Sequence, residues 1–97
     1  MTTAAERKHL AALANLGCIV CRNIGHYGTH PEIHHLRTGM GTGQRNSHYN
    51  AIPLCHVHHR TGNYGTAFHA GQAAFEKNFG TELELWAQVQ ELLKAAA

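Results

Sequence analysis

The sequence has few charged residues and no long apolar stretch. Charged residues make up 14% of the 97 positions, and the formal net charge is only +2, which is too small for strong nonspecific binding to DNA. No apolar run is long enough to cross a bilayer, and the N-terminus carries no secretory signal with an apolar core. We therefore expect a soluble cytoplasmic protein with no membrane partner.

The sequence also lacks the cysteine pairs of a disulfide framework and most of the aromatic residues that fill a core. Three cysteines are an odd number, and only one Trp, three Tyr and three Phe stand beside ten glycines. A domain this small with so sparse a core usually needs additional stabilisation, such as a disulfide or a structural metal ion. Thiolate ligands of a metal ion fit three cysteines better than disulfides do, and they favour a reducing compartment.

Histidine, by contrast, is abundant, with ten scattered along the chain. Ahead of most of them, the spacing of apolar residues predicts a helix over residues 3–16. Thr3 and Glu6 form a capping box at its start, and Gly17 is well placed to end it. Residues 18–31 are expected to be a metal knuckle followed by an irregular loop.

Two further helices are expected in the C-terminal third. One covers residues 66–79, although Gly71 within it disfavours helix. The last covers residues 81–96, where Thr81 and Glu84 form a second capping box ahead of an apolar stripe.

The middle of the chain has the pattern of two short strands separated by a glycine-rich turn. The strands are expected over residues 32–38 and 49–54, and Pro53 marks the second as an edge strand or one that stops early. Residues 55–60 are expected to begin a helix. Strand, loop, strand and helix in this order, with metal-ligating residues at both ends, indicate a ββα-metal arrangement.

Two pairs of metal-ligating residues have the spacing of a structural zinc site. One pair is Cys-x-x-Cys and the other is Cys-x-x-His, and each spans a single turn. Zinc bound to both pairs would tie distant parts of the chain together and offset the weakness of a small core. The alternative is that the cysteines are small buried hydrophobic residues. The predicted ligands of this structural Zn²⁺ are Cys18, Cys21, Cys55 and His58.

A second set of polar residues remains once the zinc site is filled: His34, His35, Asn50 and His59. Hydrolysis of a phosphodiester needs a divalent metal, a base that activates water and a group that orients the base. His34 and His35 are neighbours in a predicted strand, so they face opposite sides and must differ in role. On a helix, successive residues diverge by about 100°, so His59 can turn to a second metal while His58 turns to the zinc.

These motifs resemble the HNH endonucleases and, more narrowly, the phage recombination-enhancement, RecA-dependent nucleases. The resemblance spans roughly residues 17–80. It is carried by His34-His35-Leu36-Arg37, the Gly-x-Gly-x-Gly loop with Arg45, Ile52-Pro53-Leu54-Cys55-x-x-His58-His59-Arg60, Phe68-His69-x-Gly71 and the segment from Phe75-Glu76 to Gly80. It implies a metal-dependent DNA endonuclease, of phage or prophage origin, that cuts where a RecA-type filament has paired a strand.

The resemblance also assigns roles to single residues. It makes His34 and His59 ligands of a catalytic divalent metal (Mg²⁺, Mn²⁺ or Zn²⁺), His35 the general base and Asn50 the residue that orients the base. His69 matches a histidine of the family pattern and either completes the coordination or is a packing histidine.

Three arginines flank the proposed metal site and are expected to bind DNA phosphates: Arg37, Arg45 and Arg60. A guanidinium can clamp a phosphate through two hydrogen bonds, and the glycine loop permits close approach of backbone. The alternative is that they are ordinary solvated groups. No feature suggests readout of base edges, so we expect recognition by backbone and shape.

The sequence thus predicts an α+β fold: a single HNH-type nuclease domain over residues 1–97, with a zinc-stapled core at 17–80 between helices at 3–16 and 81–96. The rival interpretation is a non-catalytic zinc module that binds nucleic acid or a protein, but it leaves the second His/Asn set unexplained. A redox role for the Cys-x-x-Cys motif is disfavoured because the motif follows a helix instead of a strand.

Overall fold

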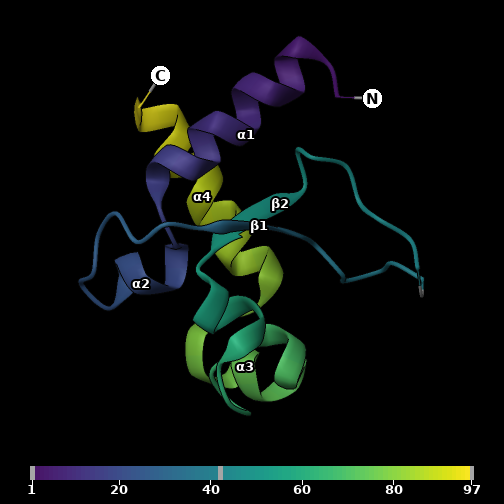
Figure 1. The fold of residues 1–97 in the computed structure, drawn as a ribbon, viewed down its shortest axis with the longest axis vertical. Coiled ribbons are helices and arrows are strands. Elements are labelled where there is room, and N and C mark those ends of the chain that lie inside the picture. Colours follow the sequence, from purple (N-terminus) through teal and green to yellow (C-terminus); the bar gives the residue numbers. More distant parts are fainter. Residues whose placement is uncertain (1, 42, 97) are drawn as a thin grey trace.

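A two-stranded antiparallel sheet lies at the centre of the molecule, with long helices toward one end and short helical segments toward the other (Figure 1). The computed structural model describes residues 2–41 and 43–96. Strand β1 (Glu32–His35) pairs with β2 (Ala51–Leu54), so that Glu32 lies opposite Leu54 and His35 opposite Ala51. The predicted α+β class is therefore confirmed.

Both strands are shorter than predicted. β1 ends at His35: the Leu36 N–H still donates to the Asn50 carbonyl, but the N–H groups of Arg37 and Thr38 donate to the carboxylate of Glu82. β2 begins only at Ala51 because the preceding residues form a turn, in which the Asn50 N–H donates to the carbonyl of Ser47.

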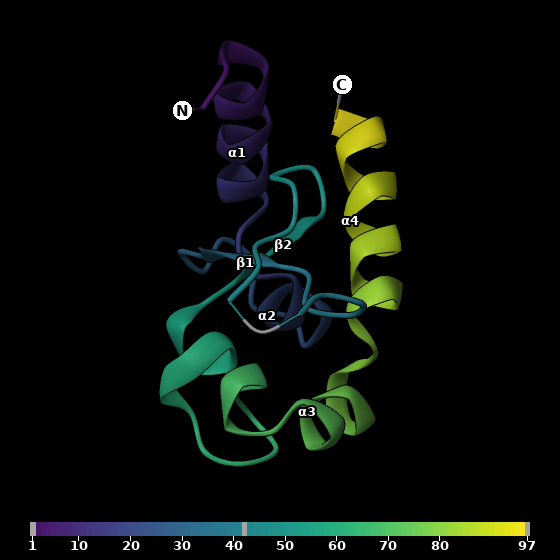
Figure 2. The same ribbon diagram turned by 90° about the vertical axis from the view of Figure 1, so that its right-hand side faces the viewer.

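The two long helices flank the sheet and run in opposite directions, with the start of α1 and the end of α4 at the same end of the molecule (Figures 1 and 2). α1 spans Ala4–Leu16 and α4 spans Glu82–Ala96, close to the predicted bounds. Both predicted capping boxes are present. The hydroxyl of Thr3 accepts from the Glu6 amide at 3.1 Å, and that of Thr81 accepts from the Glu84 amide at 3.1 Å.

The short helical segments differ from prediction in three places. The expected irregular knuckle contains a helix, α2 (Ile19–Asn23). The segment after β2 is a π-helical turn, η1 (Val57–Thr61), closed by a 3.0 Å bond from the Gly62 N–H to the Val57 carbonyl. The helix expected over residues 66–79 is divided into a 3₁₀ turn, η2 (Phe68–Ala70), and α3 (Gln72–Phe79).

The division falls at Gly71, which the ring of Tyr64 approaches so closely that a Cβ there would lie 2.6 Å from the ring. The core draws apolar side chains from α1 to α4, from η2 and from β2. Its fully buried members include Leu13, Ile19, Ile52, Leu54, Phe75 and Val89.

Within the described ranges, no helix combines the length and the apolar composition that a membrane span requires.

Gly17 joins α1 directly to the first cysteine, and its backbone (φ 73°, ψ 179°) is one that other residues rarely adopt. A Cβ at this position would also lie 3.1 Å from the Gly28 Cα and the Thr29 carbonyl oxygen. We expect Gly17→Ala to lower the free energy of unfolding by about 3 kcal/mol, measured by urea denaturation.

Gly28→Ala is the matched control. Gly28 has a similar φ of +78°, but a Cβ there meets nothing within 4 Å, so its loss should be about 1 kcal/mol. Equal losses in the two variants would show that the close approach at Gly17 contributes nothing.

Candidate metal centres

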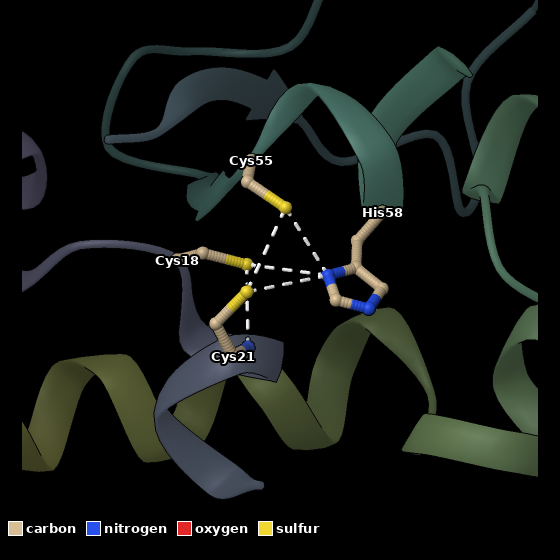
Figure 3. Close-up of side chains that lie close together, drawn as sticks. All are labelled: Cys18, Cys21, Cys55 and His58. Carbon is tan, nitrogen blue, oxygen red and sulfur yellow. Dashed lines mark hydrogen bonds between the residues drawn. The ribbon is translucent and has the colours of Figure 1, made fainter. Parts of the chain in front are cut away.

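The three cysteines and His58 converge on one point in the interior (Figure 3). Cys18 and Cys21 come from the start of α2, and Cys55 and His58 come from the end of β2 and from η1. The Cys21 and Cys55 Sγ atoms are 3.7 Å apart. The Nδ1 atom of His58 lies 3.2 Å from the Cys55 Sγ, 3.5 Å from the Cys21 Sγ and 3.8 Å from the Cys18 Sγ.

Three of these four distances fit the edges of a tetrahedron around a metal ion, and the Cys55–His58 distance is shorter. With Zn–S bonds of about 2.3 Å and a Zn–N bond of about 2.0 Å, tetrahedral geometry places neighbouring ligand atoms about 3.5 to 3.8 Å apart. Burial raises the pKa of the Cys18 thiol to about 12, so a thiolate there requires a bound cation. Burial lowers the pKa of His58, which keeps its ring neutral as a ligand must be. The Cys₃His cluster can hold a metal ion such as zinc.

A second cluster contains His34, His59 and His69. Each contributes a ring nitrogen, and the three nitrogens lie within 4.8 Å of one another. The Nε2 atoms of His59 and His69 are only 3.1 Å apart, close to the separation of about 3.3 Å for two imidazoles on one tetrahedral Zn²⁺. Burial lowers the pKa of His59 and of His69, so both offer lone pairs at neutral pH.

Carboxylates that we did not predict from the sequence hold two of these histidines. Nε2 of His34 lies 2.6 Å from Oε2 of Glu82, and Nδ1 of His59 lies 2.8 Å from Oε1 of Glu32. Carboxylate–histidine pairs of this kind orient the imidazole ligands of metal sites. Burial alone would raise the pKa of Glu82, but hydrogen bonds from His34, Thr38 and the Arg37 amide lower it to about 2.

The histidine predicted to be the base has a different partner from the one expected. Nε2 of His35 lies 2.9 Å from Nδ1 of His48, whereas the side-chain amide of Asn50 donates to Asn46 at 3.0 Å. Burial and, after it, the charge of Arg45 lower the pKa of His35. Its ring is therefore neutral and able to accept a proton at neutral pH. The role of Asn50 as its orienting group stays a prediction.

A cavity of about 430 Å³ opens beside the three-histidine cluster. Its lining residues include His34, His35, His59, His69, Arg37 and Arg45. The guanidinium of Arg37 donates to the carbonyls of Gly41 and Gln44, within its own loop. Arg60 makes a two-pronged ion pair with Glu32, with nitrogen–oxygen distances of 2.7 and 2.9 Å. Arg45 is the exposed arginine at the edge of the cavity.

The sequence reasoning did not identify Glu32, Glu82 or His48. Glu82 looks like an ordinary acidic residue in the first turn of a helix, and it reaches His34 across 48 positions of sequence. Glu32 stands at the start of a strand, 27 positions before His59. No local pattern identifies such partners, because they become visible only when the fold brings them to the histidines.

A comparison with known protein families identifies the family of this chain. A family model described as "recombination enhancement, RecA-dependent nuclease" matches residues 2–94. Among curated proteins, no match was found. The family description makes the chain a nuclease, an enzyme that acts on DNA in recombination. With nearly its whole length matched, the chain belongs to the recombination-enhancement, RecA-dependent nucleases.

Proposed function

We propose that the chain is a metal-dependent endonuclease of the HNH type, which hydrolyses DNA phosphodiester bonds at sites where a RecA filament has paired a strand. The observation that carries the proposal is the cluster of His34, His59 and His69 beside a cavity edged with arginine. A structural zinc site alone would not require these residues. We further propose that the enzyme acts in the cytoplasm of a bacterial cell and derives from a phage or prophage.

In this proposal the antiparallel strands and η1 form the ββα-metal core. A divalent cation held by the three histidines would neutralise charge that develops on the phosphate and stabilise the leaving oxygen. His35 takes a proton from the attacking water, as its lowered pKa allows. Two residues are candidates for holding the base in place. His48 lies against it, with its Nδ1 atom facing Nε2 of His35, and Asn50 is the residue that the family resemblance assigns to this role, although its side chain donates to Asn46.

The three arginines have unequal parts in the proposal. Arg60 is paired with Glu32, and Arg37 donates to loop carbonyls, so both have a structural part in the site. Arg45 is exposed at the edge of the cavity and is the best placed of the three to bind a phosphate of the substrate.

We expect Arg45→Ala to weaken DNA binding about equally for all sequences. It should also reduce the slope of log K against log salt by about 1, because one phosphate contact is lost. Fluorescence anisotropy with a labelled duplex, without the divalent cation, measures both effects. Arg7→Ala removes the same charge from the exposed face of α1 and should leave the slope unchanged. Equal slopes for all three proteins would exclude Arg45 as a phosphate contact.

The proposal is tested by plasmid cleavage with Mg²⁺ or Mn²⁺, with and without a RecA filament on a homologous oligonucleotide. Cleavage only with the filament is the expected result. Cleavage without it would remove the RecA requirement and leave a simple HNH nuclease. The absence of cleavage under every condition would favour the rival function, a zinc module that binds nucleic acid or protein without cutting.

A further inference from the structure

The carboxylate of Glu82 contacts the proposed catalytic site at two points: the ring of His34, described above, and the backbone that follows β1. The residue is fully buried. Its Oε2 lies 2.6 Å from Nε2 of His34. Its Oε1 accepts hydrogen bonds from the Thr38 amide at 2.8 Å and from the Thr38 hydroxyl at 2.6 Å. The Arg37 amide reaches both oxygens, at 3.0 and 2.8 Å.

This contact determines which nitrogen of His34 can bind a metal. An ionised carboxylate can only accept hydrogen bonds, so Nε2 of His34 has to carry the proton. Nδ1 is then the nitrogen with a free lone pair. The ring of Phe68, with its centroid 4.4 Å from that of His34, limits the remaining freedom of the imidazole.

The amide contacts link the same carboxylate to the loop that lines the cavity. Arg37 and Thr38 follow Leu36 at the start of that loop after β1, and Arg45 lies farther along it. One side chain therefore holds both a proposed metal ligand and the start of the proposed phosphate-binding loop.

Helix capping does not explain why an ionised group is buried here. The start of α4 is already capped by Thr81 and Glu84, through bonds of 2.9 and 3.1 Å. Burying a charge is unfavourable unless partners compensate it, and an apolar residue would pack the same space without that requirement.

We propose that Glu82 is a positioning residue of the catalytic metal site. It fixes the tautomer and orientation of His34 and holds the start of the 37–45 loop at the same point. This inference rests on the proposed function, because it assumes that His34 binds the metal.

The first test is a titration with Co²⁺ of the folded protein that carries zinc at its Cys₃His cluster. Cobalt absorption and calorimetry then report on the histidine site alone. We expect Glu82→Gln to bind Co²⁺ about 10- to 100-fold more weakly than the unaltered chain. Glu84→Gln is the matched control: it removes the same charge from the same helix turn, and among the described residues the Glu84 carboxylate accepts a bond from the Thr81 amide and none from a histidine. Its affinity should stay within about twofold.

The outcomes separate this inference from the proposed function. If Glu82→Gln binds Co²⁺ as tightly as the unaltered chain, the positioning role is wrong while the metal site stands. If the unaltered chain binds no Co²⁺ at the histidines, the catalytic metal site and the positioning role both fall.

A second measurement needs no variant, so it holds even if Glu82→Gln does not fold. Two-bond ¹H–¹⁵N correlation spectra distinguish the two imidazole tautomers in the unaltered, zinc-loaded chain before Co²⁺ is added. We expect His34 to carry its proton on Nε2. A proton on Nδ1 of His34 would overturn the inference.

Discussion

Replacing His35 with alanine is expected to reduce DNA cleavage at least about 100-fold while leaving the fold and the bound metals unchanged. A positioned general base contributes roughly 10²- to 10⁴-fold to a rate. The ring of His35 is neutral, lines the cavity and is only half-buried, so its loss removes the base without opening a hole in the core. The single-turnover cleavage rate of the filament-paired substrate is the quantity to measure.

His26→Ala is the control for this prediction. His26 is exposed in the loop after α2 and lies outside the cavity lining, so its removal should leave the rate unchanged. Zinc content and the thermal unfolding midpoint are to be compared for all three proteins. A His35→Ala protein that cleaves as fast as the unaltered chain would eliminate His35 as the base.

Replacing His58 with alanine is expected to leave the chain without its tightly bound zinc and largely unfolded. Structural zinc in small domains provides about 10 to 16 kcal/mol of binding free energy, whereas a typical domain is stable by only about 5 to 15 kcal/mol. His58 is one of the four residues of the Cys₃His cluster, and its ring also packs against Phe79, with the centroids 5.2 Å apart. Mass spectrometry measures the zinc bound per chain, and far-ultraviolet circular dichroism measures the unfolding.

His56→Ala provides a control within the same turn of chain. His56 is exposed and bonds only to Thr61 among its described contacts, through a ring–hydroxyl bond of 2.9 Å and a hydroxyl–carbonyl bond of 3.2 Å. Its loss should change the free energy of unfolding by less than about 0.5 kcal/mol. A His58→Ala chain that keeps one zinc and unfolds at the same denaturant concentration as the unaltered chain would contradict the prediction that zinc bound through His58 stabilises the fold.

Features that depend on neighbouring residues could be predicted from the sequence. The capping boxes of α1 and α4 lie within four residues each, and both occur where the pattern placed them. The structure also brings together the residues of the two predicted groups, and Cys-x-x-Cys and Cys-x-x-His spacing places each pair of the first group within one turn. That the two groups bind metal ions stays a prediction.

Features that depend on distant residues could not be predicted. Beyond the end of β1, the carboxylate of Glu82 accepts the Thr38 amide, which lies on the side of the chain that faces β2 in a continued ladder. The π-helical turn after β2 has an extra residue that no propensity signals, and such turns are frequent at functional sites. The partner of His35 was missed for the same reason, because His48 meets it only across the loop between the strands.

The π-helical turn η1 has a consequence for how such an enzyme fails. Two adjacent residues of this turn serve different centres: His58 faces the cysteines and His59 faces the three-histidine cluster. In a chain that has not yet acquired the ion of its Cys₃His cluster, we expect the turn to be less well ordered, so that the restraint on His59 would fall to Glu32. We therefore expect a chain of this design to gain activity only after its Cys₃His cluster has taken up an ion.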